Sequence, residues 1–159
     1  MAKAIPDGFH TLTPHLVVPD AGKAIEFYKK AFGAKEDGRH TTPDGTRVMH
    51  AQLRIGNSVL MLAGEFPPMC LSPKARGGTS VTMHVYVEDA DAAFDRAVKA
   101  GCTVKMPMTD QFWGDRYGQV EDPFGHLWSL ATHKQDLTHE QIAANAKAAF
   151  AKMEMAGTH

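Results

Sequence analysis

The sequence predicts an α+β protein in which two tandem βαβββ modules are followed by a C-terminal helix. This prediction depends on an internal repeat and on the alternation of apolar and polar residues within it. The segment HLVVPDA begins at His15 and HVYVEDA begins at His84, and the same spacing of 69 residues relates Gly56 to Gly125. One spacing that holds from the first to the last strand of each unit indicates a duplicated structural module.

Each module begins with a strand and an amphipathic helix. Residues 13–18 and 81–87 alternate apolar and polar side chains and are rich in β-branched residues, as strands are. Asp20 and Asp89 stand at N-cap positions, and a glycine ends each helical segment that follows. Turn residues separate three more strands in each module. Their predicted ranges are 35–41, 46–55 and 58–63 in the first module and 102–107, 115–121 and 126–132 in the second.

We expect residues 1–159 to form a single domain. Its parts are the first module at 8–64, a linker rich in proline and glycine at 65–80, the second module at 81–134 and a helical tail at 135–159. In the tail, Thr138 and Gln141 form a capping-box pattern, which predicts a helix over 139–154. The apolar stripe of this helix should pack either on the sheet of its own chain or on the partner in a homodimer.

Composition and charge exclude several classes of function. With 43% hydrophobic and 22% charged residues, the chain is an ordinary globular protein, and its net charge of -1 offers no basic surface for a nucleic acid. It contains neither the apolar core of a signal peptide nor a run of about 18 apolar residues that would span a membrane. We therefore expect a cytoplasmic protein that binds neither nucleic acid nor membrane.

Strand periodicity sorts the side chains of each module into a set that faces the helix and an opposite set. Leu16, Val18, Val85 and Val87 belong to the helix-facing set. The opposite set, which we expect to line one cup, is too polar for a closed core, because burial of unpaired charges is costly. It is either a solvated sheet face or a binding site. Its members are His15, His50, Gln52, Arg54, His84, Tyr86, Gln119 and Glu121.

The loop at 111–117 is a second candidate element of a site. It holds Phe112, Trp113 and Tyr117 beside Gly114. Clustered aromatic residues next to a glycine suit the wall or lid of a site for an apolar ligand, and they equally suit a hairpin that packs on neighbouring strands. The sequence has no nucleophile elbow and no phosphate-binding glycine loop, so acyl transfer and nucleotide binding have no support.

The stretch DQFWGDRYGQVEDPFGHLW, from Asp110 to Trp128, resembles the PhnB-like branch of the vicinal oxygen chelate superfamily. Its DPFGHLW part resembles the closing turn and strand of that superfamily, which includes glyoxalase I, extradiol dioxygenases, fosfomycin-modifying enzymes and bleomycin-binding proteins. The resemblance covers residues 8–134 and implies the glyoxalase-like fold of two βαβββ modules. It says little about the substrate, because this fold supports many chemistries.

In metal-dependent members of that superfamily, side chains from the first and last strands of both modules bind one divalent ion. The positions that this resemblance implies here are His15, Leu60, His84 and Ser129. The two histidines suit a divalent Zn, Ni, Mn or Fe ion, whereas Leu60 and Ser129 replace the expected glutamates and offer no strong anionic ligand. Glu121, His50, water or substrate would then complete the coordination.

The resemblance implies two alternative functions. The first is a metal-assisted lyase, isomerase or related enzyme, with His15 and His84 as metal ligands and with Glu121 or His50 as the catalytic base. The second is metal-free binding of an aromatic or cationic small molecule, such as an antibiotic, as in the bleomycin-resistance branch, with Trp113, Tyr86 and Tyr117 as stacking surfaces and Glu121 for charge. The retained histidine pair favours the enzyme, and the missing glutamates favour the binding protein. The candidate ligand-binding residues are Gln52, Arg54, Tyr86, Trp113, Tyr117 and Ser129.

Overall fold

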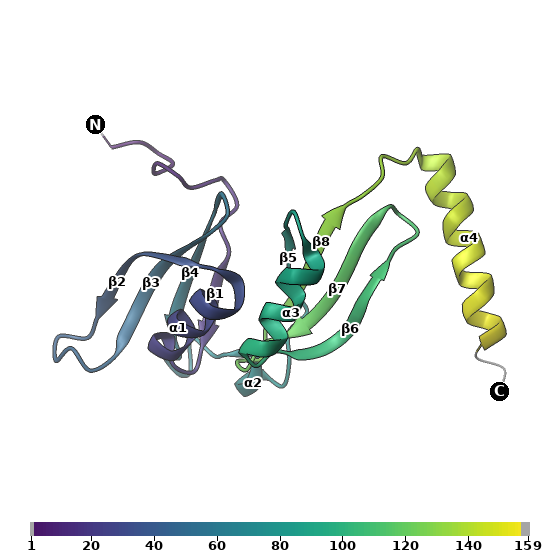
Figure 1. The fold of residues 1–159 in the computed structure, drawn as a ribbon. Helices are drawn as coiled ribbons and strands as arrows, with labels where there is room; N and C mark the ends of the chain where they lie inside the picture. Colours follow the sequence, from purple (N-terminus) through teal and green to yellow (C-terminus); the bar gives the residue numbers. More distant parts are fainter. Residues whose placement is uncertain (1, 157–159) are drawn as a thin grey trace.

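The structure, a computed structural model, describes residues 2–156. Its elements follow the order that the repeat predicts, a strand, a helix and three strands, twice (Figure 1). A short helix that the sequence does not predict, α2, interrupts the linker. The elements are β1 (His15–Val18), α1 (Ala21–Phe32), β2 (Lys35–Thr41), β3 (Val48–Ile55), β4 (Ser58–Gly64), α2 (Pro73–Arg76), β5 (Thr82–Tyr86), α3 (Ala90–Ala100), β6 (Thr103–Asp110), β7 (Asp115–Glu121), β8 (Leu127–His133) and α4 (His139–Ala156).

The two modules form two four-stranded sheets with the same topology. The strand order is β1-β4-β3-β2 in the first sheet and β5-β8-β7-β6 in the second. In each sheet the first strand of the module runs parallel to its last strand, and the other pairs are antiparallel. This arrangement confirms the predicted α+β fold of two βαβββ modules. The two sheets are hydrogen-bonded separately, so the polar faces do not belong to one continuous sheet.

Helices α1 and α3 are capped by the residues that the sequence predicts. The carboxylates of Asp20 and Asp89 accept hydrogen bonds from backbone N–H groups in the first turn, at 3.0 and 2.9 Å. Gly33 ends α1 with a φ of 65°, a conformation that glycine adopts without a steric penalty. Each helix covers one face of its own sheet, and the two helices pack against each other at the boundary between the modules (Figure 1).

A buried carboxylate joins the two modules. Asp122, in the turn between β7 and β8, accepts hydrogen bonds from the Tyr28 hydroxyl at 2.7 Å and from the Trp128 indole N–H at 2.8 Å. Its second oxygen accepts the backbone N–H groups of Phe124 and His126. Tyr28 lies on α1, so one side chain of the second module fixes the helix of the first. Burial, with the charge of Asp122, raises the pKa of Tyr28 and keeps its hydroxyl protonated as a donor.

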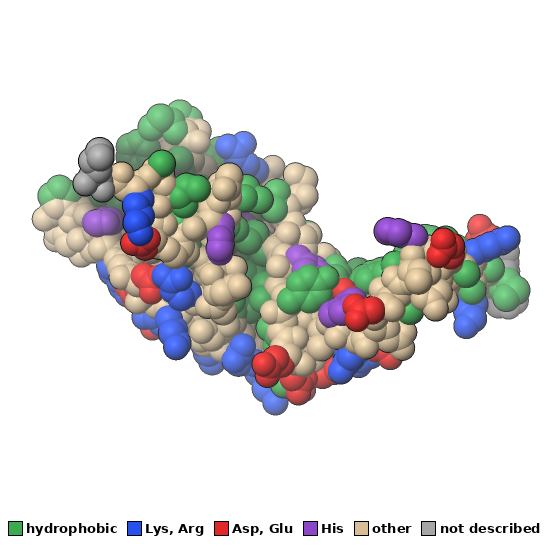
Figure 2. All heavy atoms as spheres, turned by 90° about the horizontal axis from the view of Figure 1, so that it is seen from above, with side chains coloured by type: hydrophobic (Ala, Val, Ile, Leu, Met, Phe, Trp, Pro, Cys, Tyr) green, Lys and Arg blue, Asp and Glu red, His purple; other side chains and the backbone are tan. Residues whose placement is uncertain are grey.

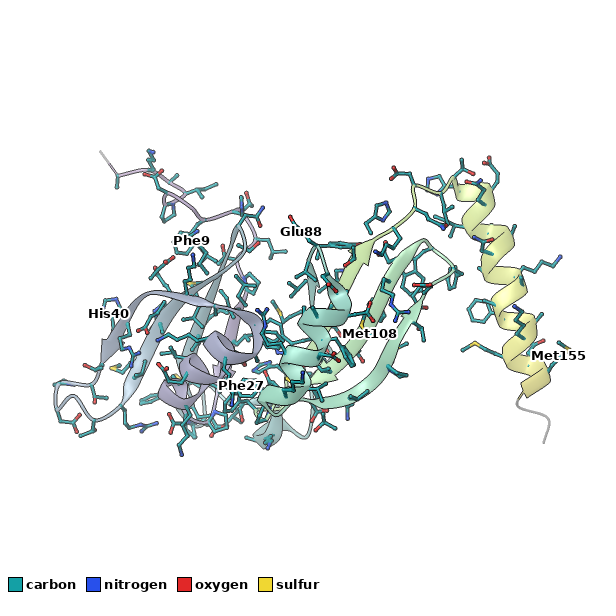
Figure 3. The ribbon with its side chains drawn as sticks, in the orientation of Figure 1. Phe9, Phe27, His40, Glu88, Met108 and Met155 are labelled. Carbon is teal, nitrogen blue, oxygen red and sulfur yellow. The ribbon has the colours of Figure 1, made fainter. Side chains whose placement is uncertain are left out.

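Aromatic rings fill the space around this carboxylate. Phe32 stacks on Trp128 with ring centroids 4.2 Å apart, and Phe27 meets Phe124 edge to face at 5.7 Å. Figure 3 shows Phe27 at the boundary between the two modules. Apolar burial of this kind supplies most of the stabilisation of a fold, and here it is shared between modules. The helix-facing sides of both sheets therefore form one core.

The tail helix α4 begins where the capping box predicts. The Thr138 hydroxyl accepts the Gln141 N–H at 3.2 Å, and the Gln141 side chain accepts the Thr138 N–H at 2.9 Å. The helix meets its own chain at the loop between β6 and β7, where the Asn145 amide donates to the Phe112 carbonyl and Phe150 approaches the Phe112 ring. Most of α4 is exposed and extends away from both sheets (Figure 1). Among the described helices, none combines the length and apolarity that a membrane span requires.

Replacing the buried carboxylate should destabilise the whole molecule. In Asp122→Ala, the Tyr28 hydroxyl and the Trp128 indole lose their acceptor inside the core, and each buried donor without a partner costs about 1–3 kcal/mol. We expect the free energy of unfolding, measured by urea denaturation, to fall by roughly 3–5 kcal/mol. Tyr28→Phe keeps the ring and removes one bond, so its loss should be about 1–2 kcal/mol. Equal stability of Asp122→Ala and the unmodified chain would contradict this role.

Candidate functional site

Strand pairing confirms the two sheet faces that periodicity predicts. Ala51 and Leu53 are fully buried beneath α1, whereas His50, Gln52 and Arg54 alternate with them on β3 and remain partly accessible. We call the side away from the helices the cup face of each sheet. On the first sheet it carries His15, His40, His50, Gln52, Arg54 and Met61. On the second it carries His84, Tyr86, Asp115, Tyr117, Gln119, Glu121, Ser129 and His133.

The predicted site residues fall into two groups, one on each sheet. His15 and His84 lie on β1 and β5, which are not hydrogen-bonded neighbours. Each histidine ring contacts rings of its own sheet, His15 with His50 at 5.5 Å between centroids and His84 with Tyr86 at 4.5 Å. No ring contact joins His15 to His84 in the described part of the chain. The predicted metal pair is therefore divided between the modules.

The prediction that Leu60 and Ser129 occupy equivalent positions is wrong, as the register of the last strands shows. His15 is paired with Met61, whereas His84 is paired with Ser129. Leu60 is 3% exposed and belongs to the helix-facing core, so it cannot reach the cup face. Met61 is the true counterpart of Ser129. The spacing of 69 residues misses this because a shift of one residue reverses the face of every side chain on a strand.

Four rings form an aromatic cluster on the second cup face, which we define as His84, Tyr86, Trp113 and Tyr117. The His84 and Tyr117 rings are nearly parallel with centroids 5.9 Å apart, and Trp113 meets Tyr117 edge to face at 5.6 Å. Tyr86 remains 63% exposed although it contacts His84. The structure thus brings together two predicted strand residues and two aromatic residues from the 111–117 segment.

Asp115 is a site residue that sequence reasoning missed. It is 3% exposed, and its carboxylate accepts hydrogen bonds from the Tyr86 hydroxyl and the Trp113 indole, both at 3.1 Å, and from the His133 ring at 2.7 Å. Burial opposes ionisation of Asp115, yet these bonds lower its pKa overall. Asp115 thereby holds two members of the aromatic cluster in place. Its position two residues before Tyr117 on a strand was the available signal, because both then share a face.

Ser129 fixes the orientation of His84. The Ser129 hydroxyl lies 2.8 Å from His84 Nδ1, and Ser129 is 1% exposed while His84 is exposed. With Nδ1 engaged, the Nε2 atom is the ring nitrogen that remains available to a ligand. Such a partner on the second nitrogen is the usual means of orienting a functional imidazole. The buried Ser129 hydroxyl therefore orients the His84 ring.

A cleft of about 600 Å³ separates the modules and reaches the aromatic cluster. Its walls come from the segment 10–14, the turn between β3 and β4, and β5 with His84 and Tyr86. Leu12, Ile55 and Met83 contribute apolar surface. Figure 2 shows hydrophobic side chains in the hollow between the modules and histidines on both sides of it. A cleft of this volume and lining suits a small organic molecule.

The remaining predicted residues are held by neighbours of opposite charge or lie apart from the cluster. Glu121 forms an ion pair with Lys105 at 2.8 Å and lines a different cleft beside α2. Arg54 pairs with Asp37 at 2.6 Å on the first sheet. Gln52 lies opposite Met61 on the same sheet. None of these three contacts the aromatic cluster.

His50 lies on the first sheet, away from the cluster. Burial lowers the pKa of His50, and the nearby charges of His15 and His40 lower it further.

The chain is similar in sequence to a known protein family and to individual proteins. The model of the glyoxalase/bleomycin resistance protein/dioxygenase superfamily matches residues 8–130. An uncharacterized protein of Mycobacterium tuberculosis strain H37Rv is 50% identical over 137 residues, which is 84% of this chain and 80% of that protein. The identity is high enough to indicate a shared fold over most of both chains.

Solved structures share the fold as well. TioX from Micromonospora sp. ML1 matches with a TM-score of 0.62 and 29% identity, over 81% of this chain and all of that one. FosX, a fosfomycin resistance protein of Listeria monocytogenes crystallised with Mn(II) and sulfate, matches with a TM-score of 0.59 over 86% of this chain and 97% of its own. Its identity is 17%, so FosX supports the fold alone.

The bonds around Asp115 predict an unusual titration of His133. Hydrogen bonds to Asp136 and then to Asp115 raise the pKa of His133 above its ordinary value of 6.5. The charged pairing of His133 with Asp115 and Asp136 is therefore fully formed at pH values below about 6.5. It is lost as the pH rises through the raised pKa of His133. It is also lost in acid, when the pH falls through the lowered pKa of Asp115. NMR titration of the ring protons should show this elevated pKa.

Asp115→Asn supplies the control for this titration. It removes the charge and keeps the size of the side chain, so the pKa of His133 should move down towards 6.5. An unmodified chain in which His133 already titrates at or below 6.5 would show that the hydrogen bonds to the two carboxylates do not persist in solution.

Proposed function

Since the chain belongs to the glyoxalase/bleomycin resistance protein/dioxygenase superfamily, we propose that it binds a small organic molecule with a planar aromatic part. The ligand lies in the cleft between the modules, with its planar part against the aromatic cluster. The observation that carries this proposal is the aromatic cluster at the edge of an apolar cleft, with Tyr86 belonging to both. Aromatic rings provide large contact areas and favourable stacking for a planar ligand.

Asp115 supports binding by fixing the cluster before a ligand arrives. Tyr86 is largely exposed, and an exposed tyrosine loses rotamer freedom when a ligand orders it. The hydrogen bonds from Tyr86 and Trp113 to one buried carboxylate already hold both rings. Less ordering is then required on binding, which raises affinity. Glu121 contributes no free charge to this site, because Lys105 pairs with it.

Metal-assisted catalysis is the second candidate function, and the Ser129–His84 contact favours it. A hydroxyl on Nδ1 leaves Nε2 of His84 directed to a metal, as outer-sphere partners of metal ligands do. In this alternative His15 and His84 bind a divalent Zn, Ni, Mn or Fe ion, and His50 or Glu121 acts as a base in a lyase or isomerase reaction. The two sheets, or two copies of the chain, would have to bring the histidines together.

A homodimer is the assembly that the exposed tail helix supports. Phe150 and Met153 on α4 are 57% and 69% exposed. Large apolar side chains gathered on one helix are typical of an interface rather than of a solvated surface. A second copy of the chain would cover them. We also propose that the chain belongs to the PhnB-like branch of the superfamily, which the segment 110–128 resembles.

Titration with 9-aminoacridine, a planar cationic probe, tests the aromatic site. We expect it to bind and quench tryptophan fluorescence, because Trp113 belongs to the aromatic cluster and Trp128, although 1% exposed, lines the cleft. Tyr86→Ala removes a stacking surface and should weaken binding by about twofold to tenfold, since an aromatic pair contributes about 0.5–1.5 kcal/mol. Tyr86→Phe keeps the ring and should lose less.

Phe66→Ala is the matched control for this experiment. Phe66 is an exposed aromatic residue in the linker, 61% accessible and outside both the cleft and the cluster. Its removal should leave the dissociation constant unchanged. Equal weakening in Phe66→Ala and Tyr86→Ala would show non-specific adsorption of the probe and would refute the proposed site.

A further inference from the structure

Three histidines cross the cup face of the first sheet in a row. His40 on β2 and His50 on β3 are directly paired residues, and their ring centroids lie 6.3 Å apart. His15 on β1 reaches towards His50 from the other side, with centroids 5.5 Å apart. The residue of β4 opposite His50 is Ala63, whose methyl group leaves room for the two rings to meet above the sheet. Figure 3 shows His40 on the outermost strand of the module.

The ring nitrogens of this histidine row are free of hydrogen bonds within the part of the chain that the structure describes. Among residues 2–156, no hydrogen bond or ion pair is formed by the side chains of His15, His40 or His50. In contrast, the rings of His84, His126 and His133 all have hydrogen-bond partners. His15 and His40 are exposed and His50 is partly accessible, so an ion from solvent reaches all three.

The spacing of His15 and His50 fits chelation of one metal ion. An imidazole nitrogen binds a transition metal at about 2.0–2.1 Å, which places two ring centroids about 5–5.5 Å apart at ordinary bond angles. The observed separation is 5.5 Å. His40 is farther from His50, and among the described residues no three histidine, cysteine or acidic side chains already converge on one point. Rotation of the exposed His40 side chain is the adjustment that a third ligand requires.

We propose that His15 and His50 chelate a transition-metal ion on the first sheet, with His40 as a third ligand and water or a bound molecule in the open position. A set of neutral imidazoles prefers Zn(II), Ni(II) or Cu(II) over Mg(II) and Ca(II), which take oxygen ligands. The carboxylate of Asp37 on β2 is already paired with Arg54. This site shares His15 with the repeat-related pair but takes His50 in place of His84, and it contains no member of the aromatic cluster.

Isothermal titration of Zn(II) into untagged, chelator-treated protein tests this proposal. We expect one ion per chain, and visible absorption of the Co(II)-substituted protein should report nitrogen ligands. His15→Ala and His50→Ala should each weaken binding at least about tenfold, a loss that even an outer-sphere partner produces in metal sites. His40→Ala should give a smaller loss. If circular dichroism shows that His50→Ala does not fold, His50→Gln, whose side chain is of similar size, replaces it in the zinc titration.

His139→Ala is the matched control, because it removes an exposed histidine on α4, and His84→Ala distinguishes this site from the repeat-related pair. We expect zinc affinity unchanged in both variants. Absence of zinc binding would overturn the proposal, as would full binding in His50→Ala. Loss of binding in His84→Ala with retention in His50→Ala would also overturn it and would assign the metal to the repeat-related pair. Binding of 9-aminoacridine should be unaffected by His50→Ala, which separates this site from the proposed aromatic one.

Discussion

The carboxylate of Asp122 holds the two modules in one orientation. It is 3% exposed and accepts four hydrogen bonds, two from backbone N–H groups of its own turn and two from the side chains of Tyr28 and Trp128. The bond from Tyr28 joins the two modules, and so does a hydrogen bond between the His126 ring and the Val17 carbonyl at 2.9 Å. A buried charge needs its partners in fixed places, because an unpaired one costs several kcal/mol. The width of the cleft between the modules depends on this network.

Because the helix-facing sides of both sheets form one core, polar residues are left to the cup faces, and the two faces differ in chemistry. The first carries His15, His40 and His50, whose rings contact one another and have no hydrogen-bond partner among residues 2–156. The second carries an aromatic cluster held by Asp115. Duplication of a module produces equivalent positions, and different residues at those positions give the two faces different chemistry. His15 and His84 keep the same residue type at equivalent positions, whereas Met61 and Ser129 do not.

Strand and helix positions were predictable because they follow local periodicity and capping. The predicted strands 35–41 and 115–121 match β2 and β7, and the caps at Asp20 and Asp89 are confirmed. The face of each residue along one strand was also predictable. Register between strands was not, because it depends on pairing rather than on sequence spacing, and this is why Leu60 was misplaced. The role of Asp115 was hidden for a similar reason: Tyr86 lies 29 residues away on another strand.

Mapping the bound probe on the protein tests the central claim, that a planar ligand occupies the aromatic cluster beside the cleft. Amide chemical shifts would be recorded with ¹⁵N-labelled protein before and after saturation with 9-aminoacridine. The account predicts that the largest changes occur in β5, β7 and the segment 111–114, with smaller changes at the turn between β3 and β4 that lines the cleft and little change in β2. Changes confined to α4 or to the first sheet would contradict the account, because the ligand would then bind away from Tyr86 and Trp113.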